Sequence, residues 1–238
     1  MNHVLQDCIG KNVEVYVDDI IVKSQKSEQH ARDLKQILDT LDKFKIKLNP
    51  DKCVFGVKAG KFLGFMISHR GIEANPEKME AILNMKAPKT LNELQKLNGR
   101  ITALGRFISC SAKKCLPLFR ALKNSKKFEW NDDCQKAFEE IKKFLTSPPL
   151  LSRPVPNETL YLYLSIGYKS IASVLVREEG SQQQPVYYVS KVLRGAEIRY
   201  PKLDKLAMII VHTSKKLRQY FQAHSIIIRT NFPLRKIL

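Results

Sequence analysis

Acidic residues are scarce in this sequence, in which 23 Asp and Glu stand against 41 Lys and Arg among 238 residues, giving a formal net charge of +18. A chain this basic repels itself unless it meets a polyanion, and nucleic acid is the commonest polyanion. A basic protein that is merely soluble, or one that binds anionic lipid, is the alternative. No strongly apolar amphipathic helix with a basic face supports lipid binding. The charge therefore favours a nucleic-acid partner, and the lack of such a helix argues against a membrane partner.

Long apolar runs and paired cysteines are also missing. No run of apolar residues reaches the ~18 that a membrane-spanning helix needs, and the N-terminus lacks the apolar segment of a signal peptide. The cysteine count is odd and no Cys-x-x-Cys spacing occurs, so neither a disulfide framework nor a zinc site is indicated. Free thiols suit a reducing compartment. We expect an intracellular protein, cytoplasmic or nuclear, that is not secreted.

What remains is the composition of a globular protein, with 44% apolar and 27% charged residues. A chain of this length can bury one large core or two to three small ones.

The most informative stretch is Tyr16-Val17-Asp18-Asp19, which separates the apolar runs 13–15 and 20–22. β-Branched residues on both sides of a short polar step predict a β-hairpin whose tip presents two adjacent carboxylates. Oxygen ligands on a rigid turn match what Mg²⁺ demands. The alternative is a solvated turn without function. Burying strands beside a charged tip is costly unless the charges have a role, which favours a site.

Residues 13–24, Val-Glu-Val-Tyr-Val-Asp-Asp-Ile-Ile-Val-Lys-Ser, resemble the catalytic hairpin of reverse transcriptases from plant gypsy-type long-terminal-repeat retrotransposons. Three later motifs are similar to that family in the same order: Phe62–Phe65, Trp130–Cys134 and Val186–Lys191. The resemblance covers nearly the whole chain. It implies the reverse transcriptase and ribonuclease H region of a polyprotein, truncated at both ends.

The expected fold class is α+β, in three parts. By resemblance, residues 1–75 are the C-terminal part of a polymerase palm, 76–148 are the thumb and connecting helices, and 149–238 are a degenerate, incomplete ribonuclease H-like domain.

Local patterns place the first elements. Apolar residues at steps of three and four predict a helix over 27–47, and strands are expected over 53–55 and 61–67. Helices are predicted to begin at Asn75-Pro76 and at the capping box Thr90–Glu93. Two further helices are expected, at 115–122 and 132–145.

Prolines at 148, 149, 154 and 156 mark a boundary. Beyond it, strands are predicted over Leu160–Leu164, Ile171–Val176 and Pro185–Ser190, then a long helix over 200–220 and a strand over 226–228. A mixed sheet with a long helix matches the start of the ribonuclease H fold that the resemblance implies.

The resemblance also assigns roles at the hairpin. Asp18 would be the ligand of Mg²⁺ or Mn²⁺ and Asp19 an accessory carboxylate, with Tyr16 and Val17 beside the primer end. The segment that grips the primer terminus would hold the residues Phe62, Leu63 and Gly64.

The expected helical bundle is basic, because residues 76–146 hold 15 Lys and Arg against 8 Asp and Glu. Lys113, Lys114, Lys126 and Lys127 lie outside its apolar stripes, where they could follow a phosphate backbone. A solvated surface is the alternative for such lysine pairs.

The metal site looks incomplete on this sequence. Phosphoryl transfer by two metals needs acidic side chains from separate strands. In the family the partner aspartate lies on the strand before the hairpin, and residues 1–12 offer only Asp7, in a helix-like stretch. We therefore expect no polymerisation by this chain alone.

The ribonuclease H-like part lacks its acids. Aligned by the surrounding motifs, the three catalytic positions hold Ser165, Leu206 and Asn231. Asp204 lies two residues from the helical position, about 200° round the helix, and would face elsewhere. These losses predict no hydrolysis, and within the resembled lineage a ribonuclease H-like domain without these acids is read as a structural connection domain.

Nucleic-acid binding does not require those acids. Residues 201–238 hold 8 Lys and Arg with one Asp, and Tyr200, Tyr220 and Phe221 are interspersed. Basic groups among aromatics suit phosphate contact with base stacking. The alternative is that the aromatics are core on the buried face of the helix, which we expect for Phe221.

Two functions follow. The first is a fragment of a retrotransposon RNA-directed DNA polymerase with a ribonuclease H-like domain, whose partner is a template–primer, either an RNA–DNA hybrid or a DNA duplex. The alternative is a catalytically inactive nucleic-acid-binding remnant of that polyprotein.

Overall fold

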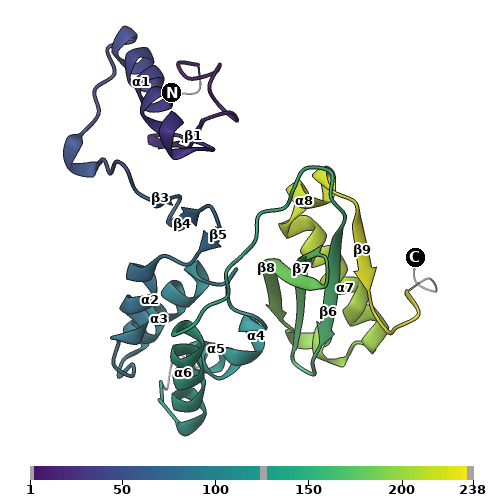
Figure 1. Cartoon of the computed structure of the whole chain (residues 1–238). Helices are drawn as coiled ribbons and strands as arrows, with labels where there is room; N and C mark the ends of the chain where they lie inside the picture. The colour runs from purple at the N-terminus through teal and green to yellow at the C-terminus, as the bar shows by residue number, and fades with distance from the viewer. Residues whose placement is uncertain (1–2, 124–127, 235–238) are drawn as a thin grey trace. The chain divides into compact units, whose positions relative to one another are not determined.

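The computed structural model describes residues 3–123 and 128–234, which form two compact units, Met1–Arg70 and Gly71–Leu238 (Figure 1). Helices and sheets occur in both, so the predicted α+β class is confirmed. The predicted division into palm, thumb and ribonuclease H-like parts, with boundaries after residues 75 and 148, stays a prediction. None of the described helices is long and apolar enough to cross a membrane.

The first unit is built on the predicted hairpin. Strand β1 (Val13–Tyr16) pairs antiparallel with β2 (Asp19–Val22), and helix α1 (Ser27–Lys43) packs against them. Leu5, Val13, Ile37 and Leu41 form the buried centre.

Helix α1 ends four residues before the predicted residue 47. Lys45 adopts a positive φ of 55°, and the amide of Ile46 donates to the Leu41 carbonyl at 3.0 Å. A left-handed residue followed by this hydrogen bond is a common way to end a helix.

Two strand predictions in this unit were wrong. Residues 53–55 form no strand, and Val54 and Phe55 are 74% and 55% exposed. The predicted strand 61–67 is a hairpin of β3 (Ala59–Phe62) and β4 (Phe65–Ser68), because Leu63 and Gly64 both take positive φ and reverse the chain. Two positive φ values are what a two-residue type I′ turn requires.

The second unit opens with β5 (Gly71–Glu73) and a set of helices. They are α2 (Pro76–Leu83), α3 (Leu91–Ala103), α4 (Ser111–Lys114), α5 (Leu116–Lys123) and α6 (Asp132–Leu145). Both predicted caps are present, since Asn75 and Thr90 accept from the amides of Glu77 and Glu93. Glu93 also accepts from the Lys89 amide at 2.7 Å.

Cations hold the bundle together at the end of α2. Arg100 of α3 donates to the Ala81 carbonyl, and Lys142 of α6 donates to the Met85 carbonyl, both at 2.7 Å. These contacts satisfy carbonyls that have no partner within the helix and place positive charge at its negative end.

The proline-rich segment between bundle and sheet is packed. Leu151 is fully buried and exchanges two backbone hydrogen bonds with Ile72, at 2.8 and 3.0 Å. A Cβ at Gly71 would lie 2.3 Å from the Leu151 carbonyl oxygen, so only glycine fits there.

A mixed four-stranded sheet follows. Its strands are β6 (Leu160–Ile166), β7 (Ser170–Glu179), β8 (Gln182–Val192) and β9 (Ile226–Arg229), in the order β8-β7-β6-β9. Only the β6–β9 pair is parallel. All four predicted strands are present, and each is longer than predicted.

Helices cover one face of this sheet (Figure 1). The predicted helix 200–220 is two helices, α7 (Lys202–Lys216) and α8 (Arg218–Ala223), separated at buried Leu217. Leu160, Leu162 and Leu175 form the centre of the core with Leu217.

The bundle and the sheet are joined along β8, which is one of the two edge strands of the sheet. The Tyr188 amide donates to the Arg106 carbonyl at 3.2 Å. Ser190 Oγ lies 2.7 Å from Ser111 Oγ and accepts from the Ala112 amide at 3.0 Å. These bonds cover an edge that would otherwise be open to strand addition.

A double-mutant cycle tests how α7 is held on the sheet. Ser173 Oγ and Thr213 Oγ1 lie 2.7 Å apart, and both side chains are buried. Ser173→Ala or Thr213→Val alone leaves the other hydroxyl without this partner, and we expect each to cost about 1–3 kcal/mol. The double variant should lose less than the sum, measured by urea unfolding. Additive losses would show that the two hydroxyls do not interact.

Candidate functional site

The two carboxylates lie at the exposed tip of the β1–β2 hairpin. Tyr16 and Asp19 form the last residue pair, and Val17 and Asp18 make the turn between them. Tyr16 is 58% and Val17 69% exposed, and both aspartates are exposed. The hairpin therefore presents its acidic pair to solvent, as predicted from the flanking strands.

The backbone of this turn is strained. Val17 has a φ of +53°, and Asp18 does not share it. A positive φ at the first turn position alone is the type II′ pattern, which normally takes glycine. A β-branched residue there is an outlier that costs roughly 1–2 kcal/mol. Such strain is concentrated at functional sites, where the surrounding structure enforces it.

The base of the hairpin is held by packing and hydrogen bonds, whereas its tip is exposed to solvent. Val13 is fully buried, and Lys23 Nζ pairs with Glu14 Oε1 at 2.5 Å across the strands. The Lys23 amide also donates to the Asn12 carbonyl at 2.8 Å. A rigid base under a short tip holds Asp18 and Asp19 in a defined direction.

The donors fit a hard divalent cation in kind, because both are carboxylates. Among residues 3–123 and 128–234, no group of three His, Cys, Asp or Glu side chains is placed to hold a metal ion. Asp7, the one acid among residues 3–12, is exposed in a turn and not in a helix. The tip thus supplies two ligands.

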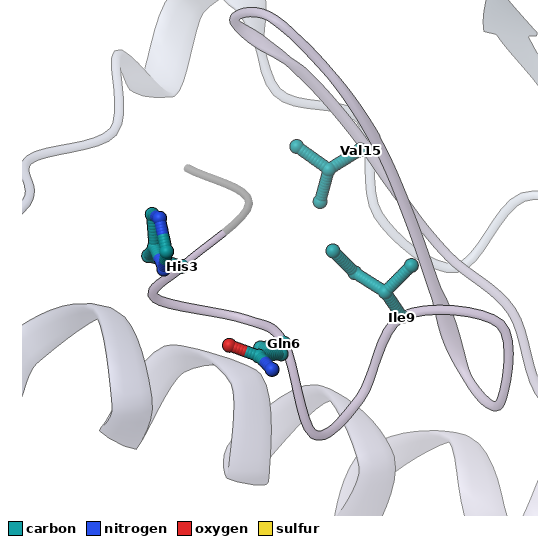
Figure 2. Close-up of a pocket in the computed structure, with 4 residues that line it drawn as sticks. All are labelled: His3, Gln6, Ile9 and Val15. Carbon is teal, nitrogen blue, oxygen red and sulfur yellow. The ribbon is translucent and has the colours of Figure 1, made fainter.

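An open pocket of about 420 Å³ lies beside the hairpin, between the N-terminal segment and β1 (Figure 2). His3, Gln6 and Ile9 line it from the N-terminal segment and Val15 from the strand. None of these four residues carries a carboxylate, so they offer no acidic metal ligand of the kind found at the hairpin tip.

The expected primer-gripping residues form a second exposed tip. Phe62 ends β3, and Leu63 and Gly64 make the turn, with Leu63 42% exposed. Strand β3 packs beside β2, since a Cβ at Gly60 would lie 3.3 Å from Ile21 Cδ1. The two hairpins are therefore neighbours in one unit.

The predicted phosphate-binding lysines differ from one another. Lys113 is exposed. Lys114 Nζ donates to the carbonyl and hydroxyl oxygens of Ser109, at 2.6 and 3.0 Å, and lies 4.7 Å from the centre of the Phe144 ring. Its ammonium is engaged within the bundle, which leaves Lys113 as the better placed of the pair. Lys126 and Lys127 lie outside the described residues.

The three expected nuclease positions do not share an environment. Ser165 on β6 and Asn231 after β9 are exposed, whereas Leu206 on α7 is buried. Successive strand residues face opposite sides, and Leu164 packs in the core under α7, so Ser165 faces away from it. Asp204 is exposed, on a different side of α7 from Leu206 as helix geometry predicts.

The C-terminal aromatics and histidines are mostly structural. Tyr220 and Phe221 pack against the core of the sheet, and burial raises the pKa of Tyr220. Tyr200 is 42% exposed. Burial and the charges of Lys216 and Lys191 lower the pKa of His212.

Sequence reasoning missed Tyr168, a 75% exposed aromatic in the β6–β7 turn, and the buried Lys205 beneath it. The available signal was an aromatic residue between Gly167 and Lys169, at the point where one strand ends and the next begins.

Two family matches lie along the chain in the same order as the motifs in its sequence. Residues 1–67 match the family described as reverse transcriptase (RNA-dependent DNA polymerase). Residues 130–228 match the RNase H-like domain found in reverse transcriptase.

Curated relatives include the Transposon Tf2-3 and Tf2-7 polyproteins of Schizosaccharomyces pombe. They are 28% and 27% identical over 224 residues, which is 94% of this chain and 17% of each polyprotein. The chain thus spans about a sixth of the relatives that it matches. Together, the family matches and these relatives support the reverse transcriptase and ribonuclease H-like region of a long-terminal-repeat retrotransposon polyprotein.

Solved structures share the fold. The foamy viral protease-reverse transcriptase in complex with double-stranded DNA aligns with a TM-score of 0.81 and 21% identity, covering 99% of this chain and 49% of that one. The same protein in complex with an RNA/DNA hybrid gives 0.83 and 22%, covering 99% and 32%.

Replacing Val17 by glycine tests the strain at the tip. We expect Val17→Gly to stabilise the hairpin by up to about 1 kcal/mol, because glycine accepts a positive φ freely. Val15→Gly is the matched control on a regular strand position and should destabilise it. Amide hydrogen exchange of the β1 and β2 strands measures both. Equal destabilisation by the two substitutions would mean that Val17 carries no strain.

Proposed function

We propose that this chain is part of a retrotransposon RNA-directed DNA polymerase and that it binds a template–primer, either an RNA–DNA hybrid or a DNA duplex. The observation that carries the proposal is the pair of exposed carboxylates on a strained hairpin tip, within the stretch that matches the reverse transcriptase family. The formal net charge of +18 favours a polyanionic partner. The similar foamy viral enzyme was solved with double-stranded DNA and with an RNA/DNA hybrid, which supports the same class of ligand.

The proposal assigns a role to each residue at the two hairpin tips. Asp18 would hold Mg²⁺ or Mn²⁺ with Asp19 as an accessory carboxylate, and such an ion would stabilise charge on a reacting phosphate. Tyr16 and Val17 would lie beside the primer end. Leu63, exposed on the neighbouring hairpin, would contact the primer terminus together with Phe62 and Gly64.

A second candidate is favoured for the chain acting by itself, namely nucleic-acid binding without catalysis. Two carboxylates make half of a two-metal site, and the described residues contain no third ligand grouped with them. Ser165, Leu206 and Asn231 bring no acid to the ribonuclease H-like lobe. The lobe would then act as a structural and binding module.

Two finer assignments belong to the same proposal. The similarity of residues 13–24 to plant gypsy-type elements supports an origin in that lineage. The five cysteines, all free, are consistent with a reducing compartment such as the cytoplasm or nucleus.

Salt titration of duplex binding tests the proposal. We expect a fluorescein-labelled RNA–DNA hybrid of 20 base pairs to bind, with affinity falling steeply between 50 and 200 mM KCl. Each neutralised phosphate contributes about −0.9 to the slope of log K against log salt, so four contacts would give roughly −3.6. Fluorescence anisotropy gives both the affinity and the slope.

The control is Asp18→Asn, measured in buffer without divalent metal. This substitution removes a negative charge and removes no phosphate contact. It should bind the hybrid at least as tightly as the unchanged chain. Absence of binding, or binding that does not respond to salt, would contradict the proposed function.

A further inference from the structure

The β6–β7 turn displays one aromatic side chain outside the site described above. Tyr168 is 75% exposed, although it lies between strands β6 and β7 of the four-stranded sheet. The turn is tight, because the Gly167 amide donates to the Ser170 carbonyl at 2.7 Å. A Cβ at Gly167 would lie 2.9 Å from that same oxygen, so the turn requires glycine there.

A buried lysine fixes this turn from below. Lys205 on α7 is 5% exposed, and its Nζ donates to the carbonyls of Ile198 and Tyr168 at 2.7 and 3.2 Å. Burying an ammonium is costly unless it is hydrogen-bonded, and these two carbonyls accept hydrogen bonds from it. The lysine therefore ties the turn to helix α7 and to the 3₁₀ helix η3 (Gly195–Arg199).

The tyrosine ring itself is flanked by cations. Lys205 Nζ lies 5.7 Å and Lys169 Nζ 5.8 Å from the ring centre, within the ~6 Å over which a cation is attracted to an aromatic face. The backbone is fixed from both sides, so the ring is held near positive charge while most of its surface stays open to solvent.

A fixed, exposed aromatic beside lysines has the chemistry of a stacking platform. Every base has a flat face that can stack on such a ring, and an adjacent cation can neutralise the neighbouring phosphate. In a duplex the base faces are already covered by their neighbours, so only an unpaired base offers one.

We propose that Tyr168 stacks an unpaired base of single-stranded nucleic acid, with Lys169 at the adjoining phosphate. The inference rests on the proposed nucleic-acid binding and names a single-strand contact on the ribonuclease H-like lobe. This contact lies three residues after Ser165 and uses no metal ligand.

Binding of a fluorescein-labelled oligothymidylate of 20 nucleotides to the full chain tests it. Tyr168→Ala should weaken single-strand binding about fivefold or more, because one stacked base is lost. Tyr168→Phe keeps the ring and should stay within about twofold of the unchanged chain. Affinity for the hybrid duplex should not change in either variant.

Salt dependence separates stacking from charge. Tyr168→Ala should leave the slope of log K against log salt unchanged, whereas Lys169→Ala should reduce its magnitude by about 0.7, the value for one phosphate on a single strand. Unchanged thermal unfolding would show that the variants remain folded, as expected for an exposed Tyr168 and a half-buried Lys169.

Two results would overturn the assignment: single-strand affinity unaffected by Tyr168→Ala, or an equal loss on single strand and duplex. Failure of the unchanged chain to bind either probe would instead overturn the proposed function itself, and the stacking contact with it.

Discussion

The second unit depends on how the outer edge of strand β8 is covered. The Arg106 carbonyl accepts from the Tyr188 amide, and the Pro185 carbonyl accepts from the Ser152 amide at 2.8 Å, so a loop within the bundle and the segment that follows the bundle both bond to the same strand. The Arg106 guanidinium lies 4.4 Å from the centre of the Tyr187 ring and adds a cation–π contact to this seam. Bundle and sheet therefore belong to one compact unit. In the proposed function, the ribonuclease H-like lobe would have a structural role through this seam.

The first unit uses backbone geometry to build its candidate site. Val17 and Leu63 are both large apolar residues held at positive φ, on two neighbouring hairpins. Glycine would be easier at both positions, so the side chains present there gain something that offsets the strain. In the proposed function, that gain is contact with the primer beside the two carboxylates. Buried Val13 and the Lys23–Glu14 ion pair hold the base of the hairpin against that strain.

Local chemistry made much of this fold predictable. β-Branched residues around Asp18 and Asp19 defined the hairpin, and the side chains of Asn75 and Thr90 defined two helix starts. The sequence could not reveal that Leu63 would take a left-handed conformation, so one predicted strand proved to be a hairpin. Tertiary contacts were equally hidden: Lys114 is an ordinary surface lysine in sequence, yet Ser109 and Phe144 engage its ammonium. The exposed Tyr168 depends on Lys205, a residue 37 positions away along the chain.

The central claim is that this chain binds a template–primer but supplies only half of a metal site. Primer extension on an RNA template with Mg²⁺, using the purified chain beside its Asp18→Asn variant, tests that claim most directly. The account predicts no extension by either protein, with the duplex still bound by both. Extension by the unchanged chain that is lost in the variant would contradict it, because a further carboxylate would then have to complete the site.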